Sequence, residues 1–232
     1  MDRRRVLVAG ASGGTGRAVL DVFAHTDWRV RAVTRSESTA DWLDGRADEV
    51  VVADLMNPRG AARAAADVDA VVTTVGSTPA QVLRASEFVD GTGNVHLVDA
   101  ALAAGAETFV MESSLGVGGD RASWLARVFG VAIEPVLAAK AEAEAALRES
   151  GLTYTVLRPG VLVGDWARGD VEVAAAGTGL WGVVSRHDVA RLLVAALATP
   201  AAHDRTLEVV RNPLQRGAGE RIDWRLPGER RP

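Results

Sequence analysis

Short apolar runs rich in valine alternate along the chain with longer stretches rich in alanine and leucine. Continuous apolar runs are typical of strands buried on both faces of a parallel sheet, and the longer stretches predict the helices that cover those faces. The expected strands are residues 5–9, 29–34, 49–53, 70–75, 108–113, 153–158 and 206–210. The expected helices are residues 15–24, 59–66, 91–104, 135–150 and 187–198, with Pro135 at a first helical position. This order predicts one α/β domain over residues 1–232, a Rossmann-type doubly wound parallel sheet in a three-layer α/β/α arrangement.

A glycine-rich stretch follows the first expected strand and leads directly into the first expected helix. Gly10, Gly13 and Gly16 recur at every third position. Glycine there allows a sharp turn, a close approach of the backbone to a pyrophosphate, and tight packing of helix on strand. The free N–H groups and positive dipole end of the helix then attract phosphate. We therefore expect a dinucleotide to bind this glycine loop (residues 10–16), which comprises Gly10, Ala11, Ser12, Gly13, Gly14, Thr15 and Gly16.

The end of the second expected strand bears on the choice between NAD and NADP. An acidic residue there would bind a ribose 2′-hydroxyl, whereas an arginine accommodates a 2′-phosphate. Arg35 and Ser36 stand at this position, and the first carboxylate is Glu37. The sequence therefore favours NADP(H) over NAD(H), although a solvated surface arginine would also explain Arg35. Further cofactor contacts are expected at the same sheet edge after the third and fourth strands, from Asp54, Leu55, Thr74, Val75 and Gly76.

Composition removes several other kinds of site. A net charge of −4 gives no electrostatic reason to expect nucleic acid or an anionic membrane as partner. The chain has no cysteine, which excludes disulfides and thiolate chemistry, and His25, His96 and His203 lack metal-ligand spacing, so no metal site is expected. No apolar run is long enough to span a bilayer, and no secretory leader is evident. We expect a cytoplasmic protein that is a monomer or a weak homodimer.

The glycine loop and further stretches at residues 98–101, 109–114, 147–154, 157–160 and 185–190 resemble the atypical short-chain dehydrogenase/reductase superfamily. The similarity is greatest to the NmrA-like proteins and the biliverdin-IXβ (flavin) reductases. The resemblance implies an active site in which a serine after the fifth strand and a Tyr-x-x-x-Lys pair surround the nicotinamide. Ser114 matches that serine best and Lys140 matches the lysine, but Val136 stands where the tyrosine is expected. Cofactor contacts are also implied for Ser113, Pro159, Gly160 and Val161.

Lys140 is the only lysine among 26 basic residues. Val136, Ala143 and Leu147 share its helix face, so the side chain is expected to point inward and to bind the nicotinamide ribose. An ion pair with Glu144, one turn later, is the simpler alternative.

The missing tyrosine limits the chemistry. A general acid contributes about 10²–10⁴-fold to a proton transfer. Flavins, quinones and linear tetrapyrroles tolerate its loss because they spread the arriving charge, so a conjugated small-molecule acceptor is expected. Our first hypothesis is an NADP(H)-dependent oxidoreductase with Ser114 and Lys140 as its catalytic residues. The alternatives are a non-catalytic NADP-binding regulator or assembly factor and, third, an NAD(P)-dependent epimerase or dehydratase.

The segments at residues 115–134 and 160–184 are expected to line the substrate pocket. They carry Trp124, Trp166 and Trp181, whose planar rings could stack on a planar acceptor, although ordinary packing explains them equally well. The Gly-, Arg- and Pro-rich residues 212–232 are expected to form a loosely packed C-terminal extension. Ser185 or Asp188 is the expected cap of the last helix.

Overall fold

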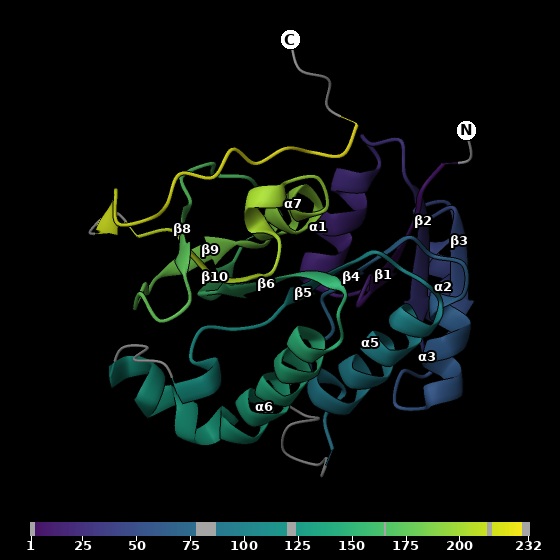
Figure 1. Cartoon of the computed structure of the whole chain (residues 1–232), viewed down its shortest axis with the longest axis horizontal. Coiled ribbons are helices and arrows are strands. Elements are labelled where there is room, and N and C mark those ends of the chain that lie inside the picture. Colours follow the sequence, from purple (N-terminus) through teal and green to yellow (C-terminus); the bar gives the residue numbers. More distant parts are fainter. Residues whose placement is uncertain (1–2, 78–86, 120–123, 165, 213–214, 229–232) are drawn as a thin grey trace.

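The computed structural model describes residues 3–77, 87–119, 124–164, 166–212 and 215–228, with backbone alone at residue 119 and residues 124–133. A central sheet carries helices on both faces, which gives three layers (Figure 1). The eight strands of this sheet lie in the order β3-β2-β1-β4-β5-β6-β10-β8. Their bounds are β1 Arg5–Ala9, β2 Arg29–Thr34, β3 Glu49–Val52, β4 Ala70–Thr73, β5 Thr108–Glu112, β6 Thr153–Pro159, β8 Glu172–Ala175 and β10 Arg205–Val210.

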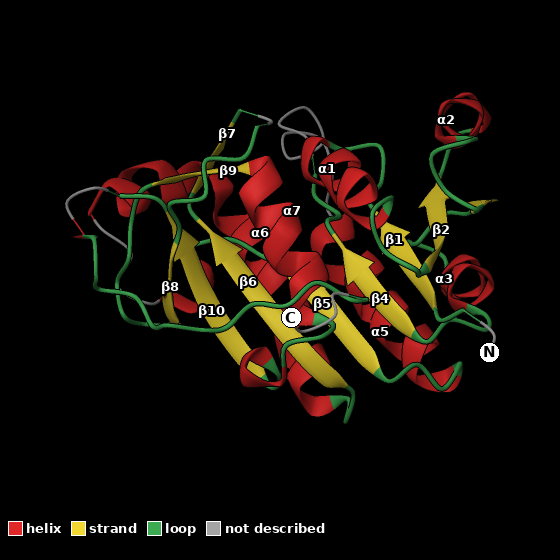
Figure 2. Ribbon diagram, turned by 90° about the horizontal axis from the view of Figure 1, so that it is seen from above, coloured by secondary structure: helices red, strands yellow, loops and turns green. Residues whose placement is uncertain are grey.

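All neighbouring strands of this sheet are parallel except β8, which pairs antiparallel with β10. The chain moves outward from β1 first to β2 and β3 and later to β4, β5 and β6. The topological switch point therefore lies between β1 and β4, where doubly wound folds bind ligands at the carboxyl ends of the strands. Figure 2 shows the strands pointing toward the edge at which the first helix begins. The predicted Rossmann-type fold is confirmed.

The helices divide between the two faces of the sheet. Helices α1 (Gly14–Phe23) and α7 (Arg186–Ala196) pack together on one face. Helices α3 (Pro58–Ala65), α5 (Asn94–Ala103) and α6 (Trp124–Glu149) cover the other, while α2 (Glu37–Leu43) lies beside β3 (Figure 1). Val6 and Val8 of β1 enter the α1/α7 core, and Leu7 and Ala9 enter the opposite core. Burial on both faces explains the continuous apolar runs.

The structure adds elements that the sequence pattern did not indicate. Helix α2, strand β8 and the small parallel sheet of β7 (Val161–Val163) and β9 (Val183–Ser185) were not predicted. These strands are only three or four residues long, too short for their apolar residues to form a distinct run in the sequence. The prediction that Pro135 begins a helix is wrong, because Pro135 lies inside α6. Residues 124–134 contain one glycine and no proline, so their helix propensity extends α6 upstream despite the N–H that Pro135 lacks.

Part of the C-terminal extension packs against the domain, where loose packing was expected. Ile222, Trp224 and Leu226 pack against the α1/α7 core. The Glu220 N–H donates to the Val173 carbonyl (2.6 Å), and the Arg225 N–H donates to the Thr199 hydroxyl (3.0 Å). Figure 1 shows this segment crossing over α7. Within the described residues no helix combines the length and hydrophobicity needed to cross a bilayer.

Candidate functional site

The glycine loop makes the turn from β1 into α1 with a geometry that only glycine permits. Gly10 has a φ of +79°, and its carbonyl accepts a hydrogen bond from the Gly13 N–H (2.9 Å). A Cβ atom added to Gly16 would lie 2.0 Å from the Gly10 carbonyl oxygen. No side chain caps the start of α1 at Gly13, and residues 12–14 are exposed. The first N–H groups of α1 are therefore open to an anion such as a pyrophosphate.

Neighbouring side chains fix the position of the loop. The Thr74 hydroxyl, just after β4, lies 3.2 Å from the Ala9 carbonyl oxygen and 3.3 Å from that of Gly10. A Cβ on Gly10 would come within 2.7 Å of the Thr74 backbone. On the other side of the loop, Arg17 Nε donates to the Ser12 carbonyl (2.9 Å). The predicted residue Thr74 thus lies against the predicted loop at the switch point.

The end of β2 presents the residues predicted to select the cofactor. Arg35 is exposed and forms no ion pair with the residues that the structure describes. Ser36 precedes α2, and its hydroxyl is 2.8 Å from that of Ser38. The guanidinium groups of Arg17 and Arg46 lie over the Trp42 ring, 4.4 and 4.3 Å from its centroid. Arg35 is therefore available to a phosphate beside the glycine loop.

The remaining predicted residues of this edge are less open. Asp54 is exposed, and its carboxylate accepts from the Met56 N–H (3.0 Å) in a local turn. Leu55 and Val75 are buried, whereas Gly76 is exposed. These positions lie at the carboxyl ends of β3 and β4, as predicted from the parallel order.

Lys140 points inward and is paired with an aspartate that the sequence analysis missed. Its Nζ lies 2.9 Å from Asp90 Oδ1, and the two side chains are 13% and 1% exposed. Asp90 belongs to a π-helical turn (Val89–Gly93), and its Oδ2 accepts from the Ser77 N–H (2.7 Å). A Cβ on Gly91 would lie 2.9 Å from the Ala139 side chain, so this glycine lets the turn approach α6 closely.

The alternative partner of Lys140 is occupied by other groups. Glu144 Oε1 accepts from the Ser113 hydroxyl (2.6 Å) and from Arg158 Nε (3.0 Å), and Oε2 accepts from Arg158 Nη2 (2.7 Å) and Arg148 Nη1 (3.0 Å). Burial would raise the pKa of Glu144, but the hydrogen bonds from Arg158 and Ser113 hold that pKa below its usual value. The Ser113 hydroxyl thus faces α6, while the half-buried Ser114 hydroxyl donates to the Leu115 carbonyl (3.2 Å).

Glu112 is a second buried carboxylate at the end of β5 that the sequence analysis did not single out. Its Oε1 accepts a hydrogen bond from the hydroxyl of Thr15 in the glycine loop (3.0 Å), and the residue is 8% exposed. Burial raises the pKa of Glu112 to about 7, against the opposing effects of Lys140, the Thr15 hydrogen bond and Arg186. A carboxyl group that titrates near neutrality at the ligand-binding edge of a sheet is typical of a functional site.

The first turn of α7 borders the glycine loop. Ser185 caps α7 by accepting from the Asp188 N–H (3.0 Å), which confirms the predicted cap. Arg186 crosses the loop so closely that a Cβ on Gly14 would lie 2.6 Å from Arg186 Cδ. The sequence signal for Arg186 was present in the stretch at residues 185–190, but the strand order was needed to place it beside the loop.

The segment after β6 lies at the same carboxyl edge of the sheet, where β7 and β9 pair (Figure 2). A Cβ on Gly160 would lie 2.3 Å from the Gly182 carbonyl oxygen, so this glycine permits the close crossing. Pro159 is buried, whereas Val161 is exposed. Trp166 and Trp181 are 61% and 45% exposed, and the side chain of Trp124 lies outside the described residues.

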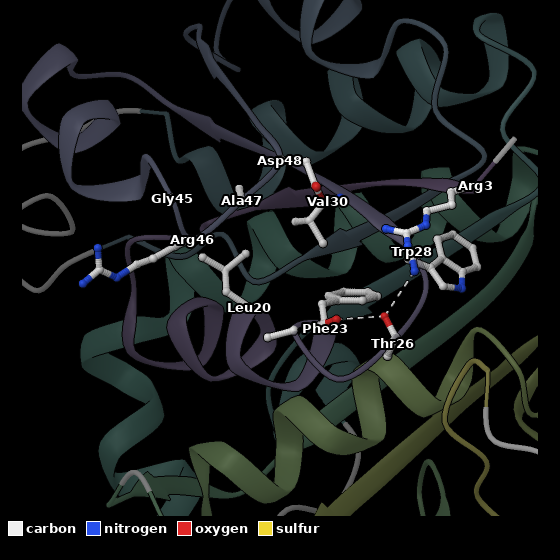
Figure 3. Close-up of a pocket in the computed structure, with 11 residues that line it drawn as sticks. Arg3, Leu20, Phe23, Thr26, Trp28, Val30, Gly45, Arg46, Ala47 and Asp48 are labelled. Atoms are coloured by element: carbon white, nitrogen blue, oxygen red, sulfur yellow. Dashed lines mark hydrogen bonds between the residues drawn. The ribbon is translucent and has the colours of Figure 1, made fainter.

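A pocket of about 260 Å³ lies elsewhere on the molecule, beside α1 and β2. Phe23, Trp28 and Val30 line it, with Arg3 and Arg46 at opposite ends (Figure 3). It contains none of the predicted site residues. Among the described residues there is also no group of three His, Asp or Glu side chains placed to hold a metal ion.

Comparisons with known proteins place the chain among nucleotide-binding proteins. A family model described as NAD(P)H-binding matches residues 10–200. The chain is 32% identical over 207 residues to a Bacillus subtilis (strain 168) protein named "Uncharacterized sugar epimerase YhfK", with 88% of this chain and 93% of that protein covered. It is 32% identical over 218 residues to the chloroplastic protein At2g34460 of Arabidopsis thaliana, described as uncharacterized, with 89% and 76% covered. The solved structure of ChuY, described as an anaerobillin reductase from Escherichia coli O157:H7, superposes with a TM-score of 0.79 at 25% identity, covering 90% of this chain and 98% of ChuY.

Proposed function

The chain belongs to the NAD(P)H-binding family, and on that premise we propose that it is an NADP(H)-dependent oxidoreductase acting on a conjugated small-molecule acceptor. The bound nicotinamide would supply the hydride. The uncapped N–H groups of the glycine loop would bind the pyrophosphate. The exposed guanidinium of Arg35, with the Ser36 hydroxyl, would bind a 2′-phosphate. Ser114, at the carboxyl edge after β5, would orient the nicotinamide or the acceptor.

The observation that carries the proposal is the combination of an inward lysine with no tyrosine beside it. Lys140 uses one N–H donor on Asp90 and retains two for ribose hydroxyls. Val136 stands one turn earlier, where a proton-donating tyrosine would be needed. The chain's only tyrosine, Tyr154, is the second residue of β6 and so lies at the opposite, amino end of the strand. An acceptor that delocalises the arriving charge fits this arrangement better than a simple ketone.

The ChuY similarity supports a reductase, since that neighbour is described as one. The name of the Bacillus subtilis relative favours an epimerase instead. In the superfamily that the chain resembles, epimerases and dehydratases also need a tyrosine at the position of Val136. We therefore rank an epimerase or dehydratase third. A non-catalytic NADP-binding regulator fits the missing tyrosine as well, and only turnover separates it from a reductase.

The test of catalysis mixes the purified protein with NADPH and a panel of flavins, quinones and linear tetrapyrroles, and follows nicotinamide absorbance. We expect oxidation with at least one acceptor and a loss of roughly 10²-fold in kcat/KM for Lys140→Met, the range typical of a lost catalytic contact. Lys140→Arg, which can keep an ion pair with Asp90, is the control for folding. Tight NADPH binding by the wild type without turnover on any acceptor would favour the regulator.

The test of cofactor preference measures the affinities of NADP⁺ and NAD⁺ by calorimetry. Arg35→Ala removes the proposed charge-assisted contact and should lower the preference for NADP⁺ by about tenfold or more. Arg29→Ala is a matched control, because Arg29 is an exposed arginine at the other end of the same strand. An unchanged affinity ratio in Arg35→Ala rules out the 2′-phosphate assignment.

A further inference from the structure

Glu112 occupies a position between the nucleotide loop and the first turn of α7. Along β5, Phe109 and Met111 enter the α5/α6 core and Val110 enters the α1/α7 core, so the alternation turns Glu112 toward α1 and α7. Its Oε1 is bound by Thr15, the second residue of α1. Its Oε2 accepts no hydrogen bond from the residues that the structure describes. The Glu112 carboxyl group is thus buried, and one of its two oxygens is hydrogen-bonded to the glycine loop that would bind the pyrophosphate.

The charged groups around Glu112 do not neutralise it. Arg186 of α7 and Lys140 of α6 are the cations that lower its pKa, but burial raises that pKa by more, and the Lys140 ammonium is bonded to Asp90. Asp188, also on α7, is turned to the Ser185 hydroxyl and to the N–H groups of Arg168 and Gly169.

The remaining elements contribute no compensating charge. On α1, the Arg17 guanidinium is directed to the Ser12 carbonyl and the Trp42 ring. On β6, Arg158 binds Glu144 on the other face of the sheet. His187 of α7 is half-buried with its Nδ1 unpaired among the described residues. At the carboxyl end of β4, Thr73 is the last residue of the strand and Thr74 follows it, and both are uncharged.

A bound dinucleotide would therefore place its negative phosphates beside a buried carboxylate. Two like charges in a poorly solvated site cannot both be ionised without a large cost, and the group with the nearer pKa accepts the proton. A pyrophosphate stays ionised under these conditions, whereas burial already raises the pKa of Glu112 to about 7. The Glu112 carboxylate is therefore the group that accepts the proton.

We propose that Glu112 is a residue of the nucleotide site that takes up one proton from solvent when the glycine loop binds a dinucleotide. The proton adds to a carboxylate oxygen, and the neutral carboxyl group lies beneath the phosphates in the complex. The proposal rests on the proposed function, because it requires the dinucleotide to bind at the glycine loop. It goes further in assigning Glu112 as the group that makes nucleotide affinity depend on pH.

The sign of the effect follows from linkage. The complex holds more protons than the free protein, so affinity falls as the pH rises through the pKa of free Glu112. With a free pKa of about 7 and a higher value in the complex, the Kd rises about tenfold between about pH 6 and about pH 8.

Calorimetric titration with NAD⁺ and NADP⁺ in two buffers of different ionisation enthalpy tests the proposal, because it measures both the Kd and the number of protons taken up. NAD⁺ is needed since the 2′-phosphate of NADP⁺ titrates near pH 6 by itself. The wild type should take up about half a proton near pH 7 and nearly one near pH 8. Glu112→Gln keeps an acceptor for Thr15 and should abolish both the uptake and the tenfold change in Kd for NAD⁺. Glu142→Gln, an exposed glutamate of α6, removes the same charge and should behave as the wild type.

The outcomes separate the two proposals. Binding of NAD⁺ with no proton uptake, or a pH dependence that survives in Glu112→Gln, overturns the assignment of Glu112 and leaves the proposed function standing. Absence of binding by the wild type at every pH overturns the proposed function itself. If Glu112→Gln does not fold, Thr15→Val replaces it: loss of the hydrogen bond that lowers the Glu112 pKa should shift the midpoint to higher pH. An unchanged midpoint overturns the proposal.

Discussion

Two buried glutamates lie on opposite faces of the sheet near its carboxyl edge, and their pKa values are shifted in opposite directions. Glu144 is fully buried against α6 and accepts hydrogen bonds from Ser113, Arg158 and Arg148. Glu112 is almost as buried against α1 but accepts one hydrogen bond, from Thr15. Burial raises the pKa of Glu112 to about 7, whereas the partners of Glu144 reverse the effect of burial and lower its pKa.

The difference shows that burial alone does not fix the charge of a carboxyl group. Burial sets the cost of ionisation, and the number of donors within hydrogen-bond distance decides whether that cost is met. Glu144 remains an anion that joins α6, β5 and β6. Burial raises the pKa of Glu112 to about 7, at the edge of the sheet where we propose that a dinucleotide binds. We thus assign a structural role to Glu144 and propose a role in the nucleotide site for Glu112.

Neutralising Glu144, the glutamate with several hydrogen-bond donors, should have the largest effect on the free energy of unfolding. Glu144→Gln removes the buried anion that pairs with Arg158 and Arg148, for which we expect a loss of about 3–5 kcal/mol in the free energy of unfolding. Urea denaturation at neutral pH measures it, with Glu142→Gln as an exposed control expected to stay within about 0.5 kcal/mol. A loss below about 1 kcal/mol would mean that the hydrogen bonds to Glu144 do not join α6, β5 and β6 as described above.

Glu112, which accepts a single hydrogen bond, should have the next largest effect on the free energy of unfolding. This effect should be absent at acidic pH and should grow as the pH rises. The pKa of Glu112 is about 7 in the folded protein, against 4.5 for an unperturbed glutamate, so the folded protein loses stability as the pH rises from about 4.5 to 7. The shift corresponds to about 3 kcal/mol at full ionisation. Glu112→Gln escapes this loss. Its stability relative to the wild type should therefore increase between about pH 5 and about pH 8. Parallel stability–pH curves for the two proteins would place the Glu112 pKa near its ordinary value.

Glu220, an exposed glutamate, should have the smallest effect on the free energy of unfolding. A hydrogen bond from Arg205 lowers the pKa of Glu220, as arginines do for Glu144, but both side chains are solvent-accessible. Solvent screening reduces the value of such a pair, so a double-mutant cycle of Glu220→Gln and Arg205→Gln should give a coupling of about 0.5 kcal/mol or less. The coupling should also weaken with added salt. A coupling as large as that of the Glu144 cluster would contradict the role assigned to burial.

The sequence predicted the fold well because the information lies in local patterns. Each apolar strand of the parallel sheet is continuous in the chain, and the glycine loop is a contiguous motif whose conformation the structure reproduces at Gly10 and Gly16. Lys140 was placed inward from its helix face alone, and its side chain is indeed largely buried.

The rest of the site depends on contacts between distant parts of the chain. Thr15 and Glu112 are 97 residues apart, and nothing near Glu112 in the sequence indicates that its side chain would reach α1. Asp90 meets Lys140 only because Gly91 lets a π-helical turn approach α6. The packed part of the tail does have a local signal, since Ile222, Trp224 and Leu226 alternate in the manner of a half-buried extended segment.

Transfer of deuterium from NADPH that carries deuterium on both faces of C4 of the nicotinamide tests the account most directly. In single turnovers with the panel of conjugated acceptors, we expect at least one acceptor to take one deuterium from the nicotinamide, NADP⁺ to form in equal amount, and the rate to slow with the deuterated cofactor. Stable binding of labelled NADPH with full retention of the label against every acceptor would contradict an oxidoreductase and leave a nucleotide-binding protein without this chemistry.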